Sequence, residues 1–132
     1  MLDKVQEKIM WHTLSAGVDD ERFPLDDFYS AARYYLGPAF TDPSGLLVPV
    51  IQFAIAKEYV VVGEMVEVGL APGGKLPATV FTPIAIGSEQ AFTLVSRYIA
   101  ENQERDPNAY AYWFVLTEKG ESEMLRYWET HD

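Results

Sequence analysis

The hydrophobic pattern of this chain changes its period near residue 59, and that change restricts the fold more than any other feature. Before this point, apolar residues recur every three or four positions, as they do on one face of an α-helix. From Tyr59 onward, β-branched and apolar residues follow one another in the way that is typical of strands. A chain with separate runs of helices and strands is expected to form an α+β fold.

The N-terminal part predicts three helices. The first ends at Gly17, which supplies a stop signal, and residues 18–22 then form a polar connector. The second begins near Pro24, because proline is favoured in the first helical turn. The third is apolar on nearly every side, which predicts a mostly buried helix, and Pro49 is expected within or close to its first turn. These helices are expected at residues 2–16, about 24–36 and about 44–57.

The C-terminal part predicts strands and two more helices. Strand-forming segments at 59–68 and 78–86 flank a turn rich in glycine and proline, which predicts a β-hairpin. A helix at 88–103, a strand at 110–116 and a last helix that begins after Thr117 are expected to follow. No internal repeat, linker or low-complexity segment interrupts the chain, so all 132 residues are expected to form a single domain.

Two strings add a family resemblance. The string AIAKEYVVVGE at 54–64 resembles the end of the third helix of a winged helix-turn-helix domain, where it runs into the first wing strand. The string WFVLTEKGESEML at 113–125 resembles the leucine-threonine-x-x-glycine junction between strand and helix in regulators of the MarR and PadR type. The resemblance implies a winged-helix-like fold with three N-terminal helices, a β-hairpin wing, and then a helix, a strand and a C-terminal helix. It also implies DNA binding.

The charged residues favour another use of such a fold. The chain has 10 Lys and Arg against 20 Asp and Glu, a net charge of -10, whereas DNA binders neutralise several phosphates with cations. The third helix and the wing offer Gln52, Lys57 and Lys75 for DNA contacts, against Glu64 and Glu67. We therefore expect a small acidic protein-interaction or regulatory module whose partner is another protein, with a basic partner as one alternative. A DNA-binding transcriptional regulator is the alternative function, which the charge disfavours.

Aromatic residues suggest where a partner would bind. They make up 14% of the chain, and aromatic side chains are enriched at protein interfaces. Our candidates for a surface patch are Tyr29, Tyr34, Tyr110 and Tyr112, with packing in the core as the competing interpretation. A small-molecule pocket between the hairpin and the helices is a third hypothesis. A homodimer through the last helix, at 118–129, is also left open.

Reactive groups are few. The absence of cysteine excludes a disulfide scaffold and a thiolate nucleophile or metal site, and there are only two histidines. The segment Gly69–Lys75 matches the spacing of a phosphate-binding loop, but Leu76 stands where such a loop needs Ser or Thr, so a turn is expected. The acidic groups at 19–21 and 26–27 lack the spacing of a calcium loop. We expect no enzymatic activity, no cofactor and no metal.

The N-terminus carries no apolar signal core. The longest apolar stretch, at 45–56, is shorter than the ~20 residues that span a bilayer. A cytoplasmic protein without a membrane partner is therefore expected.

Overall fold

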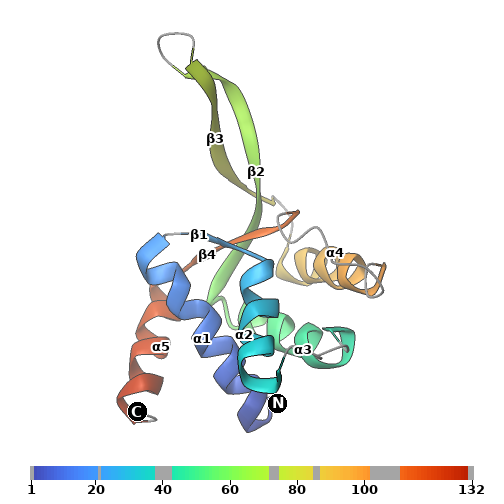
Figure 1. Ribbon diagram of the computed structural model, residues 1–132, viewed down its shortest axis with the longest axis vertical. Coiled ribbons are helices and arrows are strands. Elements are labelled where there is room, and N and C mark those ends of the chain that lie inside the picture. The colour runs from blue at the N-terminus through green and yellow to red at the C-terminus, as the bar shows by residue number, and fades with distance from the viewer. Residues whose placement is uncertain are drawn as a thin grey trace.

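The computed structural model describes residues 2–20, 22–37, 43–71, 75–84, 87–101 and 111–130, and these form an α+β fold with an antiparallel sheet. Figure 1 shows the helices gathered around one end of the sheet and a long hairpin projecting from it. The elements are α1 (Lys4–Asp20), β1 (Arg22–Pro24), α2 (Asp26–Leu36), α3 (Pro43–Ala56), β2 (Val60–Ala71), β3 (Lys75–Pro83), α4 (Ser88–Glu101), β4 (Trp113–Leu116) and α5 (Glu118–Thr130).

The core lies between the first three helices and the sheet. Its fully buried members include Leu14 of α1 and Ile51 of α3. The ring of Phe114 in β4 lies 5.6 Å from Phe23 of β1 and 5.2 Å from Phe28 of α2, measured between centroids. These separations are in the range that aromatic pairs prefer. The three rings therefore join the sheet to the helices.

The sheet has the strand order β1-β4-β2-β3, and each neighbouring pair is antiparallel. The expected hairpin is confirmed, because β2 pairs with β3 from Gly63↔Pro83 to Ala71↔Lys75. β4 lies between β1 and β2, although α4 and the whole of β3 separate it from β2 in sequence. The pairs Val60↔Leu116 and Gly63↔Trp113 mark the two ends of this β2–β4 ladder.

Three local expectations were wrong. Gly17 does not end the first helix, which continues to Asp20. A Cβ atom at Gly17 would lie 2.9 Å from Cβ of Leu116, so this glycine permits close packing of α1 on β4. Pro24 ends the short strand β1 instead of opening α2, and the pairing of β1 with β4 could not be foreseen from three residues. Pro49 lies inside α3, beyond its first turn.

The two later helices flank the helical part on different sides. In Figure 1, α4 lies beside α3 and α5 lies beside α1. α4 buries Ala91, Val95 and Ile99, and α5 buries Met124 and Tyr127, which is the amphipathic spacing expected of surface helices. Among the described residues, no helix combines the length and the apolar character that a membrane span requires.

Candidate functional site

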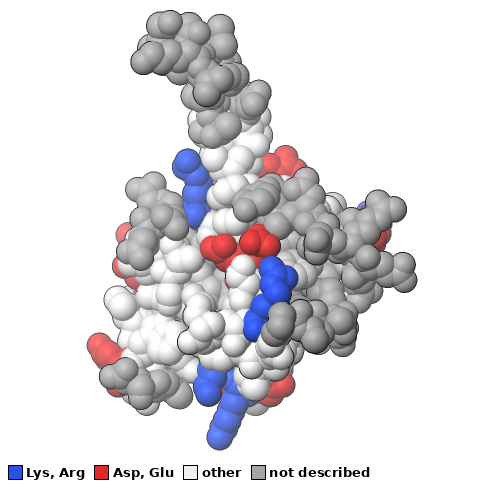
Figure 2. Space-filling view, in the orientation of Figure 1, with Lys and Arg blue, Asp and Glu red and all other residues white. Residues whose placement is uncertain are grey.

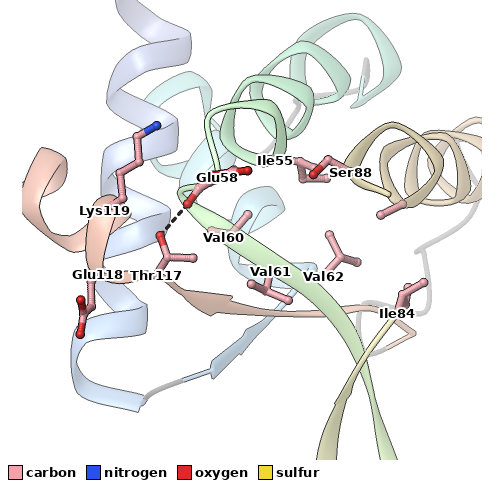
Figure 3. Close-up of a pocket in the computed structure, with 11 residues that line it drawn as sticks. Ile55, Glu58, Val60, Val61, Val62, Ile84, Ser88, Thr117, Glu118 and Lys119 are labelled. Carbon is pink, nitrogen blue, oxygen red and sulfur yellow. Dashed lines mark hydrogen bonds between the residues drawn. The ribbon is translucent and has the colours of Figure 1, made fainter. Parts of the chain in front are cut away.

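A groove opens where the end of α3, the start of β2, α4 and the start of α5 meet (Figure 3). Its volume is about 540 Å³, and a second hollow of about 300 Å³ adjoins it, sharing Ile55 and Ser88. We call the two together the α3–α4 groove. Apolar side chains form most of its floor, and charged ones stand at its rim. The floor includes Ile55, Val60, Val62, Ile84, Ala91 and Phe92.

The end of α3 places an acidic side chain at this rim. The N–H of Tyr59 donates to the carbonyl of Ala54 at 2.9 Å, and the N–H of Glu58 donates to that of Ile55 at 3.0 Å. This pair of bonds is the Schellman ending of a helix, which holds one residue in the left-handed conformation. That residue is Glu58, with φ of 61°. Glycine is the usual occupant, so a glutamate here keeps its side chain at a cost in backbone energy.

The start of α5 closes the groove from the other side. The hydroxyl of Thr117 donates to the carbonyl oxygen of Glu58 at 2.6 Å, and it accepts the N–H of Gly120 at 3.0 Å. Thr117 therefore caps α5, as its sequence position predicts, and also ties the helix to the end of α3. Gly120 allows this approach, because a Cβ there would overlap with the carbonyl oxygen of Tyr59. Thr117 and Gly120 of the junction motif therefore both contact the α3–β2 turn.

The charges at the rim are mainly negative. Glu58, Glu89 and Glu118 line the groove or its adjoining hollow. The amine of Lys119 lies 5.9 Å from the ring centroid of Tyr59. The amine of Lys57 lies 5.6 Å from the ring centroid of Phe53. Both cations thus rest on aromatic rings, while the three carboxylates face solvent around an apolar floor.

The residues expected to contact DNA do not form a basic surface in the described part of the chain. The solvent-facing positions of α3 include Gly45, Gln52 and Ala56, and Gln52 borders a hollow that Glu89 and Phe92 of α4 also line. Lys57 is exposed but lies next to Glu58. The side chain of Lys75 is outside the described residues, although its backbone opens β3.

Of the four tyrosines expected in a surface patch, the structure describes Tyr29, Tyr34 and Tyr112. Tyr29 is only 4% exposed, and burial, followed by the nearby Tyr98, raises its pKa to about 12. The prediction that Tyr29 belongs to a surface patch was wrong, because this side chain faces the core from α2. Tyr34 is 73% exposed. Tyr112 is half-buried with its ring 5.5 Å from that of Tyr98, whereas Tyr34 contacts the rings of His12 and Tyr35. Tyr110 lies outside the described residues.

The other chemical motifs resolve into structural roles. Ala71 at the end of β2 pairs with Lys75 at the start of β3, so the two ends of this motif lie on paired strands and not at a strand–helix phosphate loop. Asp26 lies 3.6 Å from the guanidinium of Arg33 and accepts a hydrogen bond from Ser30. Within the part of the chain that the structure describes, no group of three or more His, Asp or Glu side chains is arranged to hold a metal ion.

Sequence reasoning missed the residues of the acidic rim. Glu58, Glu89 and Glu118 are far apart in sequence, and although Glu58 and Glu118 lie within the two strings of family resemblance, nothing in those strings marks them as members of one site. The face shown in Figure 2 carries its Lys and Arg in small groups with Asp and Glu between them, as far as the residues are described. No protein-family model matches this chain, and no curated protein or solved structure is significantly similar to it.

Proposed function

We propose that this chain is a small acidic, non-enzymatic protein-interaction module on a winged-helix-like scaffold. Its partner presents apolar side chains flanked by Lys or Arg, and it binds in the α3–α4 groove. The observation that carries the proposal is the combination of an apolar floor with three carboxylates at its rim, where both neighbouring lysines lie on aromatic rings.

The strand pairing supports the winged-helix-like scaffold. The leucine and threonine of the junction, Leu116 and Thr117, follow β4, and β4 pairs directly with β2. β3 and α4 are then an excursion between two strands that are neighbours in the sheet. This arrangement accounts for the helix that separates the hairpin from the junction motif. It supports β2 and β4 as the common part of the scaffold and the β3–α4 segment as an addition to it.

The same addition disfavours DNA binding through α3. A recognition helix needs an open face with side chains that reach base edges and phosphates. Here α4 packs alongside α3. Its Glu89 and Phe92 share a hollow with Gln52, so a carboxylate and an aromatic ring stand where phosphate-binding groups would be needed. A carboxylate close to the DNA backbone would repel it.

A basic partner fits the groove for two reasons. Burial of apolar side chains on the floor provides affinity in proportion to the area removed from water. Carboxylates at the rim favour a partner of positive charge and increase its rate of association. The left-handed backbone of Glu58 is consistent with this role, because a glycine would hold the same turn more cheaply but without a carboxylate.

Selection of peptides from a random display library against the full chain tests this function. We expect selected peptides to combine apolar residues with Lys or Arg, and to lose most of their affinity for the triple variant E58Q/E89Q/E118Q. The matched control E7Q/E121Q/E129Q removes the same charge elsewhere and should bind as the unmodified chain does. Peptides without basic residues, or equal loss in the control, would contradict the proposal.

A mobility-shift assay with a random DNA duplex at low salt tests the alternative function. We expect no retained complex. A shift that moderate salt and the substitution Lys57→Glu both abolish would favour the DNA-binding regulator, because such a complex would depend on phosphate contacts near the end of α3.

A further inference from the structure

The wall that β2 contributes to the α3–α4 groove is the edge of a strand. Three consecutive residues, Val60, Val61 and Val62, line this groove. Successive side chains of a strand point to opposite faces of the sheet, and Figure 3 shows Val61 on the other side of β2 from Val60 and Val62. A hollow over one face of the strand would be lined by alternate residues only. The groove therefore runs along the edge of β2, where main-chain N–H and C=O groups point.

Two hydrogen bonds fix the direction of these main-chain groups near the start of β2. The N–H of Thr117 donates to the carbonyl oxygen of Tyr59 at 3.0 Å, so the odd-numbered residues point toward β4. The N–H of Ile84 donates to the carbonyl oxygen of Val62 at 3.0 Å, so the even-numbered residues point to the side of β3. Antiparallel pairing requires this alternation. The N–H and C=O of Val60 therefore point away from β4.

Val60 has no hydrogen-bonding partner for these groups in the described part of the chain. The pairing of β2 with the β3 segment stops at Ile84, opposite Val62, and residues 85–86 lie outside the described residues. Val60 is nevertheless only 4% exposed. A main-chain donor and acceptor are costly to leave unpaired in such a place. The edge therefore favours a ligand that supplies one acceptor and one donor of its own.

The surroundings of Val60 define the side chains that such a ligand needs. Ile55 of α3 and Ala91 of α4 line the groove together with Val60. Directly opposed residues of paired strands place their side chains on the same face. A residue that pairs with Val60 therefore directs its side chain toward this apolar floor. Its two neighbours direct theirs to the face of Val61, which is 39% exposed, so Lys or Arg at those positions stays in solvent.

We propose that the partner binds the α3–α4 groove as an extended strand, in line with β3 and antiparallel to β2, and pairs with the N–H and C=O of Val60. Strand addition of this kind gains affinity from main-chain hydrogen bonds and specificity from alternate side chains. The partner segment carries an apolar residue opposite Val60 and Lys or Arg on each side of it. This inference rests on the proposed function, because it specifies the conformation in which the basic partner is recognised.

Two peptides of identical composition distinguish a strand from a helix. Acetyl-KLKLKLK-amide places its leucines on one face of a strand, and acetyl-KLLKKLK-amide places them on one face of a helix. Each is titrated into the ¹⁵N-labelled full chain. We expect the alternating peptide to bind at least about 5-fold more tightly, which is the worth of one net hydrogen bond. It should also slow the hydrogen exchange of the Val60 amide and leave that of Val61, which points toward β4, unchanged.

N-methylation of the alternating peptide identifies the edge that is hydrogen-bonded. The apolar residues are those whose N–H groups face β2, so methylation of the leucine amides is expected to weaken binding about 10-fold or more. Methylation of the lysine amides that follow each leucine is the matched control. Their N–H groups point away from β2, and the expected loss is less than about 3-fold.

The outcomes separate this inference from the function on which it rests. Tighter binding of the helical isomer, equal effects of the two methylation patterns, or an unchanged exchange rate of the Val60 amide in the saturated complex would overturn strand addition. If the same binding is weakened in E58Q/E89Q/E118Q, the proposed function stands without it. Absence of saturable binding by either peptide would contradict both.

Discussion

Replacement of Gly120 by alanine is expected to destabilise the protein, although alanine is the better helix former. Gly120 lies in the first turn of α5, over the carbonyl group of Tyr59. An added Cβ would overlap with the Tyr59 oxygen and would lie 2.9 Å from both the carbonyl carbon of Tyr59 and Cδ1 of Leu116. The overlap involves main-chain atoms, which a change of rotamer cannot relieve. Either the start of α5 or the α3–β2 turn must move.

This movement would break hydrogen bonds that join the start of α5 to the α3–β2 turn. Thr117 Oγ1 lies 2.6 Å from the Glu58 carbonyl oxygen, and the Thr117 N–H donates to the Tyr59 carbonyl at 3.0 Å. Loss of two such bonds costs about 1 kcal/mol each, and overpacking adds roughly 1 to 3 kcal/mol. The helix propensity of alanine returns about 1 kcal/mol. The expected net loss of unfolding free energy is about 2 to 4 kcal/mol.

Urea denaturation followed by circular dichroism measures this loss, with Gly87→Ala as the matched control. A Cβ at Gly87 would meet nothing within 4 Å, and its φ is not left-handed, so the control should change stability by less than about 0.5 kcal/mol. Thermal unfolding of Gly120→Ala should show a decrease in Tm of about 10 °C. A Gly120→Ala variant as stable as Gly87→Ala would refute the close approach of α5 to Tyr59.

Two further outcomes follow from single residues. Glu58→Gly should raise the unfolding free energy by roughly 0.5 to 1 kcal/mol, because glycine adopts the left-handed backbone without strain. Glu58→Gln keeps the strain and serves as the control. An equal gain in stability for both variants under urea denaturation would contradict this explanation. Burial raises the pKa of Tyr29 from 10.0 to about 12. The protonated phenol of Tyr29 therefore contributes about 2 to 3 kcal/mol to the free energy of unfolding below pH 10, and this contribution is lost as pH rises toward 12. Between pH 8 and 12, the free energy of unfolding measured by urea denaturation should therefore decrease less steeply with pH for Tyr29→Phe than for the unmodified chain. The same pH dependence in both proteins would contradict the raised pKa of Tyr29.

The candidate sites illustrate where sequence reasoning succeeds. Thr117 was expected to cap the last helix, and it does so, because capping depends on residues within one turn. The deficit of cations on the third helix was also visible, since the identities of its residues are independent of the fold. Tyr29 and Tyr34 are only five positions apart on the same helix, yet one is buried and the other is exposed. Their difference depends on which face of α2 meets the core, and an aromatic stripe at helical spacing does not settle that by itself.

The sequence alone determined the order and type of most elements, because helical and strand periodicity, glycine-proline turns and caps act over a few residues. It also determined the acidic charge and the absence of cysteine chemistry. The tertiary structure decided which strands are neighbours: β4 lies between β1 and β2, so Leu116 faces Val60 across more than fifty residues of chain. It likewise decided that Gly120 contacts Tyr59 and that three distant glutamates border one groove. Such contacts depend on packing between segments that are remote in sequence, and a local sequence pattern does not show which remote segments pack against each other.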